Sequence, residues 1–241
     1  MGKYVLTNCG FWVQEHNISG YANSGEMTLS SDAIESTTYN SESAVTDRTY
    51  LPGLKGFNAS ISGFQEPQSV DALLYGEFAV DNAIITVAPE SKAIGSIAYF
   101  GYGMEAEYKA AEGAIGNMAA FSASMQGDGP VRRGNIIEWV TETDASYNST
   151  PYEVGAVGAD EYVYAVLHVS AITATNVIFK LQSDVDADFN SPIDQITFTT
   201  VTAAAVELKS LAGAITDTFW RINAERTGGS TVSFAVVMAI A

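Results

Sequence analysis

The C-terminal segment constrains the fold most strongly, because its side chains alternate in size from one residue to the next over 231–240. The larger members of the alternation are Val232, Phe234, Val236, Met238 and Ile240. A repeat of two places every large side chain on one face of a β-strand, whereas a helix would distribute them around its axis. The segment therefore predicts a strand with one face against a hydrophobic core.

Strand signals of the same kind recur through the rest of the sequence. Further strands are expected at 57–62, 83–87, 97–102, 118–125, 162–169, 177–182, 196–199 and 219–224. The run 162–169 is apolar on both faces, as is typical of a central strand. Gly228 and Gly229 predict a tight hairpin turn into the last strand. We therefore expect an all-β fold, a sandwich or barrel with one or two short helices.

One segment, 69–78, has the spacing of a helix instead. Its apolar residues Val70, Leu73, Leu74 and Phe78 fall on one helical face. Ser69 is a good N-cap, and Asp71 lies in the first turn, where the helix dipole favours a carboxylate.

A polar segment divides the chain into two regions. Residues 142–158 are rich in Ser, Thr, Asn and Gly, which is typical of a linker or long loop. This predicts an N-terminal β domain over 1–141 that contains the helix, and a C-terminal β domain over 159–241. The second domain is expected to be either a further copy of the first fold or a separate unit.

The composition narrows the possible partners. The chain has 241 residues with a net charge of −17, and charged residues make up 16% of it, against about 25% in an average globular chain. A surface that is polar mainly through neutral side chains suits contact between proteins. The acidic excess disfavours tight binding to phosphate backbones and would suit a channel wall that DNA passes without being held. The alternative is that the charge serves solubility or a salty habitat.

Motifs for catalysis and cofactor binding are missing from the sequence. The only histidines are His16 and His168, and His168 lies in the most strand-like run, where we expect it to be buried. There is no G-x-S-x-G nucleophile motif and no phosphate-binding loop, and Cys9 as the only cysteine leaves too few ligands for zinc at short spacing. We therefore expect no enzymatic activity, no catalytic residues, no cofactor and no metal.

The best candidate for a cation site is the alternate set Asp184, Asp186 and Asp188. A calcium loop of the EF-hand type needs glycine next and a carboxylate at its end, but Phe189 and Gln195 stand there. A solvated turn between strands is therefore the favoured interpretation.

Two further charged pairs are weak candidates. Glu105 and Glu107 have strand spacing, so they could face one sugar or the solvent together. The doublet Arg132-Arg133 could pair with an acidic loop on a neighbouring subunit or form a solvated hairpin end.

Targeting signals are not evident. The first residues lack the apolar core of a secretory signal, and no run approaches the length of a membrane helix. The single cysteine excludes an intrachain disulfide and fits synthesis in a reducing compartment.

Two stretches, 18–64 and 162–240, resemble the tail tube (major tail) proteins of bacteriophages with long, non-contractile tails. The first has these motifs in order: Ile18-Ser19-Gly20, Gly25-Glu26-Met27, Ser36 to Tyr39, Leu51-Pro52-Gly53-Leu54 and Ser62-Gly63-Phe64, followed by the expected helix. The second has a strand through His168 and Val169, the turn Gln182-Ser183-Asp184, a loop at Phe189, a Thr-rich strand and Asp217-Thr218-Phe219-Trp220-Arg221.

This resemblance implies a structural virion protein of the phage tail, made in the host bacterial cytoplasm. Its β units would line a continuous inner barrel, and stacked rings would form a tube that conducts DNA. The implied partners are further copies of the chain, the tape measure, terminator and distal tail proteins, and viral DNA passing without specific binding; no membrane is implied. If the fold is duplicated, which is the version we slightly favour, three chains make a ring; otherwise six chains do, with the second half outside.

The main alternative is a carbohydrate-binding or adhesive β-sandwich, or a capsid decoration protein. Such modules present converging aromatic side chains, whereas Trp12, Trp139 and Trp220 are scattered along the sequence. If the chain does form a tube, we expect short polar and acidic side chains to line its lumen. The segments Asn58 to Ser62 and Ser122 to Ser124 are the candidates for part of that lining.

Overall fold

The computed structural model describes residues 8–37, 48–66 and 68–241 and is mainly β, with two antiparallel sheets and one short helix. The predicted all-β fold class is therefore confirmed. Residues 38–39 of the Ser36 to Tyr39 motif lie outside the described residues. No helix in the described part of the chain has both the length and the hydropathy for crossing a membrane.

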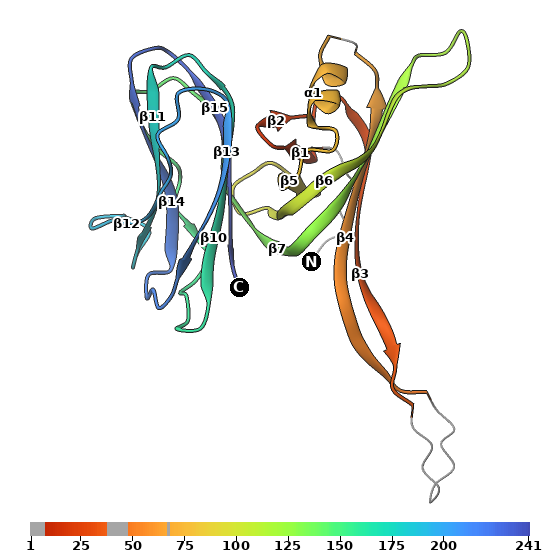
Figure 1. Ribbon diagram of the computed structural model, residues 1–241. Helices are drawn as coiled ribbons and strands as arrows, with labels where there is room; N and C mark the ends of the chain where they lie inside the picture. Colours follow the sequence, from red (N-terminus) through yellow and green to blue (C-terminus); the bar gives the residue numbers. More distant parts are fainter. Residues whose placement is uncertain (1–7, 38–47, 67) are drawn as a thin grey trace, which may run out of the picture.

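The larger sheet has ten strands and extends through both halves of the molecule (Figure 1). Its strands are β1 (Gly10–Val13), β2 (His16–Asn17), β3 (Ala22–Glu35), β4 (Tyr50–Phe64), β5 (Ala83–Ala88), β6 (Ile97–Glu112), β7 (Ala120–Glu142), β10 (Tyr162–Ile172), β13 (Ala205–Ala212) and β15 (Val232–Ile240). The order is β13-β10-β15-β7-β6-β5-β1-β2. In addition, β4 pairs with another stretch of β7, and β3 pairs with β4.

The smaller sheet has five strands and covers one face of the C-terminal part of the larger sheet. Its strands are β8 (Ser146–Asn148), β9 (Tyr152–Glu153), β11 (Asn176–Asp184), β12 (Ile193–Thr197) and β14 (Phe219–Thr227). The predicted linker 142–158 contains β8 and β9, both paired with β14. The two layers enclose a sandwich core in which Phe179, Trp220 and Phe234 are fully buried.

The strand β7 belongs to both halves of the molecule. One edge pairs with β6, and the other edge pairs first with β4 through residues 120–126 and then with β15 through residues 135–142. Between the two partners lies Gly129, at φ +83°, followed by Pro130, which has no N–H to donate. The change of partner therefore takes place where the local sequence interrupts regular pairing.

The helix α1 (Val70–Glu77) packs its buried Val70 and Leu74 against the N-terminal part of the larger sheet. It confirms the helix expected at 69–78. Ser69 precedes it but makes no capping hydrogen bond with its side chain. Instead, Asp71 accepts hydrogen bonds from Tyr108 Oη at 2.6 Å and Gln65 Nε2 at 2.8 Å, which fix the first turn to β6.

A buried joint connects the sandwich to the N-terminal half. Phe100 and Ile84 pack there against Val166 and Val237. The joint has one polar centre, His168, which is fully buried as the sequence predicted.

The contacts of His168 define its protonation. Its Nδ1 lies 2.6 Å from the Gln14 carbonyl oxygen, which can only accept, so Nδ1 carries the proton. Its Nε2 then accepts from the hydroxyl of Thr86 at 2.7 Å, and Trp12 stacks on the ring at 4.9 Å between centroids. Burial lowers the pKa of His168 to about 4, so the joint requires neutral imidazole.

The joint should therefore weaken in acid. Because the pKa is depressed in the folded state, the unfolded chain takes up a proton first as the pH falls below 6.5, and stability is lost down to about pH 4. At about 1.4 kcal/mol per pH unit the loss amounts to about 3 kcal/mol. Replacement His168→Gln should destabilise the protein by about 2 kcal/mol at pH 7.5. This deficit should shrink as the pH falls to 4, as measured by urea unfolding. A deficit that stays constant with pH would contradict the buried neutral histidine.

Candidate assembly surfaces

The first candidate surface is a polar face of four adjacent strands, β3, β4, β7 and β6, which we call the polar wall. Its polar side chains, all exposed or half-buried, are Ser24, Glu26, Thr28, Asn58, Ser60, Ser62, Glu107, Lys109, Ser122, Ser124 and Gln126, and Met104 lies beside Gln126 at its end. Pairing brings Glu26 opposite Ser60, Ser60 opposite Ser124, and Ser124 opposite Glu107. A shallow hollow of about 260 Å³ lies on this face.

The opposite face of the same strands is apolar apart from Glu105 of β6. Ala59, Ile61, Phe121, Ala123 and Met125 are buried there with α1 in one core. The alternation read in the sequence thus separates the two faces, as the pleat of a strand requires. The two segments expected to line a lumen, 58–62 and 122–124, are direct neighbours in register; whether they line a lumen stays a prediction.

The charge of the polar wall is acidic. Its one basic member, Lys109, has Nζ at 3.5 Å from Glu107 Oε1 and 3.5 Å from Glu112 Oε1. The charge of Glu107, then that of Glu112, raises the pKa of Lys109. Exposed pairs of this kind stabilise the fold little. They do surround the lysine with carboxylates, so the wall offers no cluster of free cations to a phosphate backbone.

Both margins of the polar wall are open edges. None of the described residues pairs with the outer edge of β3, and β6 pairs only with β7 over residues 106–112. Successive strands of the wall are antiparallel, so β3 and β6 run in opposite directions at the two margins. Unpaired edges of this kind are templates for another chain.

A second candidate surface is the apolar arm, formed by residues 29–35 of β3 and 50–56 of β4. Figure 1 shows these strands leaving the body as a two-stranded ribbon. Large apolar side chains stay exposed along it, with Leu29, Ile34 and Leu51 between 56% and 58% exposed and Leu54 82% exposed. A two-stranded ribbon has no second layer on which to bury such residues and is marginal alone in water. The arm therefore has the character of a surface that another protein covers.

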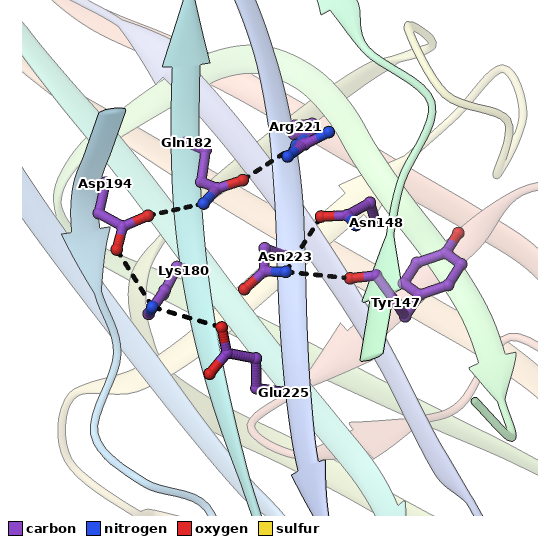
Figure 2. A network of polar contacts seen from close by, with 8 residues as sticks. All are labelled: Tyr147, Asn148, Lys180, Gln182, Asp194, Arg221, Asn223 and Glu225. Carbon is purple, nitrogen blue, oxygen red and sulfur yellow. Dashed lines mark hydrogen bonds and ion pairs between the residues drawn. The ribbon is translucent and has the colours of Figure 1, made fainter. Parts of the chain in front are cut away.

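The outer face of the smaller sheet carries a network of polar side chains instead (Figure 2). Lys180 Nζ lies 3.1 Å from Asp194 and 3.5 Å from Glu225, and Gln182 joins Asp194 to Arg221 through hydrogen bonds of 2.7 and 2.9 Å. These groups satisfy one another across β12, β11 and β14.

The tryptophans do not form a platform for a sugar. Trp220 is fully buried in the sandwich core, and its Nε1 donates to the Gly155 carbonyl at 3.0 Å. Trp12 and Trp139 meet edge to face at the joint, with ring centroids 5.6 Å apart. The alternative of a carbohydrate-binding sandwich thus gains no support from these residues.

The aspartates at 184–188 bind backbone groups of their own loop. Asp184 accepts from the N–H groups of Val185 at 2.7 Å and Ser191 at 2.9 Å, and Asp186 accepts from that of Asp188 at 3.0 Å. These bonds are those of a structured turn, and no ligand set for calcium converges on one point within this loop.

The pair Glu105 and Glu107 is separated by an irregularity in the β6–β7 register. Glu105 is 1% exposed and faces the core, whereas the Glu107 side chain is 60% exposed on the polar wall. Burial, and then the charge of Glu77, raises the pKa of Glu105 to about 8. The two carboxylates therefore face opposite sides of the sheet, and they do not form a catalytic pair.

The doublet Arg132-Arg133 lies within β7, where it pairs with Phe100 and Tyr99 of β6, so it is not a hairpin end. The guanidinium of Arg132 stacks over Tyr164 at 3.7 Å, while Arg133 is exposed.

One cluster of potential metal ligands was not predicted from the sequence. Glu15, His16 and Glu77 bring three potential ligand atoms within 4.8 Å of one another. Glu15 lies in the β1–β2 turn, His16 is the first residue of β2, and Glu77 is the last residue of α1, so no spacing in the sequence could reveal them.

No protein-family model and no curated protein matches the sequence. Among solved structures, the chain is similar to the SPP1 Dit protein, described as a paradigm of the hub adsorption apparatus in phages that infect Gram-positive bacteria. The identity is 10%, the match covers 98% of this chain and 100% of that one, and the TM-score is 0.41.

Two structures of gene transfer agent particles are also similar over part of the chain. The virion of the native particle matches with 14% identity, 46% of this chain, 82% of that one and a TM-score of 0.37. The tail of the empty particle, refined with C6 symmetry, matches with 12% identity, 46% of this chain, 80% of that one and a TM-score of 0.36.

The two faces of the wall should respond differently to substitution. Phe121→Ala removes a fully buried ring from the core face and should destabilise the protein by about 3–5 kcal/mol. Ser122→Ala, one residue further on the polar face, should change stability by less than about 0.5 kcal/mol. Urea unfolding of both variants measures the difference, and similar losses would show that the assigned faces are wrong.

Proposed function

We propose that this chain is a structural protein of a phage-like tail that assembles with copies of itself into rings, with the polar wall facing a central channel for DNA. The observation that carries the proposal is the four-strand wall itself. It has one polar face, one core face and an open antiparallel edge at each margin. The resemblance of 18–64 and 162–240 to tail tube proteins points the same way.

Ring closure follows from the directions of the edge strands. The free edge of β3 in one copy and the free edge of β6 in the next run antiparallel when copies are related by rotation about a common axis. Such a contact is heterologous, and it closes into a ring when the rotation allows. The core face is already covered by α1 and its neighbours, so only the polar wall is left to face the channel.

We propose six chains per ring, in place of the duplicated, three-chain version that the sequence slightly favoured. A trimeric ring would need a second wall from the C-terminal half, but that half is a sandwich with a different strand order and, over residues 142–241, no helix. Its outer face bears the Lys180 and Arg221 network rather than short polar side chains. We therefore propose that the sandwich lies outside the channel.

The wall suits the passage of DNA. Serine, threonine and asparagine side chains hydrate the surface, and Glu26 and Glu107 repel phosphates at short range. At physiological salt the field reaches only about 8 Å, so the effect is confined to a narrow channel. The apolar arm would pack on a neighbouring copy, in the same ring or the next, and bury residues such as Leu54.

Assembly can be tested on the purified full chain by light scattering and negative-stain microscopy. At high concentration we expect rings with a central hole, or stacks of them. Leu54→Asp should weaken association without changing the melting temperature, because the side chain is 82% exposed. The matched control is Val185→Asp, at a 66% exposed position on the sandwich, which should assemble normally. A chain that stays monomeric at its highest soluble concentration would contradict the proposal.

Whether the polar wall faces the channel can be tested on assembled rings. The double variant Ser60→Lys and Ser124→Lys should retain DNA in a gel-shift assay, with a retention that falls steeply as salt is added. The control is Val185→Lys with Ile193→Lys, which adds the same charge to exposed sandwich positions. Equal retention by both variants would show that the wall does not line the channel.

A further inference from the structure

A cluster of acidic groups and one imidazole lies where the last turn of α1 meets the β1–β2 turn. His16 Nε2 is 3.4 Å from Glu77 Oε1 and 3.9 Å from Glu15 Oε1. All three side chains are partly buried, with 24%, 13% and 29% exposed for His16, Glu77 and Glu15. The cluster is therefore reachable from solvent but largely enclosed.

Three carboxylate oxygens beside this cluster are buried without a hydrogen-bond partner. They are Oε2 of Glu77 and both side-chain oxygens of Glu105. Glu105 lies next to the end of α1, because its backbone bridges Phe78 and accepts from the N–H of Ala79 at 3.1 Å. A buried polar group without a partner costs free energy. A proton shared between Glu77 and Glu105 would remove one charge and satisfy at most two of these three oxygens, so at least one would still lack a partner.

The helix dipole makes a negative charge at Glu77 less favourable. Its carboxylate lies at the C-terminal end of α1, where the helix dipole is negative and the last turn has no basic residue. Among the described residues, the imidazole of His16 is the only basic side chain within ion-pair distance of Glu77. The local field therefore favours an added positive charge.

We propose that Glu15, His16 and Glu77 bind a divalent metal ion of the zinc class, with Glu105 accepting a hydrogen bond from a metal-bound water. One imidazole with carboxylates suits zinc, whereas calcium and magnesium prefer sets of oxygen ligands alone. A zinc ion about 2 Å from each ligand spaces the ligands by about 3.3 Å. The two separations from His16 Nε2, 3.4 and 3.9 Å, are close to that spacing, and all three ligand atoms lie within 4.8 Å of one another.

The metal would fasten the end of α1 to the β1–β2 turn, behind the core face of the polar wall. This inference does not depend on the proposed assembly, and it departs from the sequence-based expectation of no metal. The sequence showed only two histidines and no ligand spacing, and the fold brings distant residues together.

The test uses the full chain after removal of metals with a chelator. Titration calorimetry with zinc chloride at pH 7.5 should give one ion per chain, and zinc should raise the melting temperature by several degrees. Calcium and magnesium chlorides should bind much more weakly. His16→Ala and Glu77→Gln should weaken zinc binding by about 10- to 100-fold or more, and the exposed control Glu90→Gln should not change it.

Several outcomes would overturn the site. One is the absence of zinc binding to a folded chain; another is binding that survives both His16→Ala and Glu77→Gln but is lost in Cys9→Ser. In a third outcome, acid alone stabilises the folded protein, Glu105→Gln abolishes this effect, and zinc has no effect. A proton shared between carboxylates would then occupy the cluster in place of the metal. If Glu77→Gln fails to fold, Glu15→Gln at the most exposed of the three positions measures the same ligand loss.

Discussion

The hydrogen-bonded ladder along β7 is the constraint on which the rest of the structure depends. One edge of this strand holds β6, while the other holds β4 and then β15, so a single backbone sets the register of both halves. The joint around His168 fills the angle between them with buried apolar side chains and a neutral imidazole held on both ring nitrogens. The sandwich is thereby held to the N-terminal half by main-chain bonds as well as by packing.

The same ladder produces the polar wall. Because β4 pairs with β7 in register, Ser60 and Ser124 lie opposite each other, and Ala59 and Met125 lie opposite each other on the reverse face. The small polar residues therefore form a continuous surface rather than isolated positions. The open edges at its margins and the exposed leucines of the apolar arm are features that commonly mark contacts with other chains.

Much of the fold could be predicted because strand and helix periods are local properties. The alternation at 231–240, the apolar run with His168 and the helical spacing at 70–78 all correspond to elements of the structure. The length of β7 and its change of partner could not be predicted, because pairing depends on residues far away in the sequence. Glu105 and Glu107 show the limit well: two residues with strand spacing face opposite sides because a register irregularity lies between them.

Because both halves share β7, the position at which the chain can be cut or recombined is restricted. A cut near residue 142 would leave the stretch that holds β15 as a bare edge, with Ile136 and Ile137 uncovered and half of the joint removed. The sandwich, for its part, would lose an outer strand of one of its layers. Exchange of the C-terminal unit between related proteins would therefore have to carry the distal part of β7 with it. The natural crossover point is Gly129-Pro130, where β7 changes partner, ahead of the polar segment that divides the sequence.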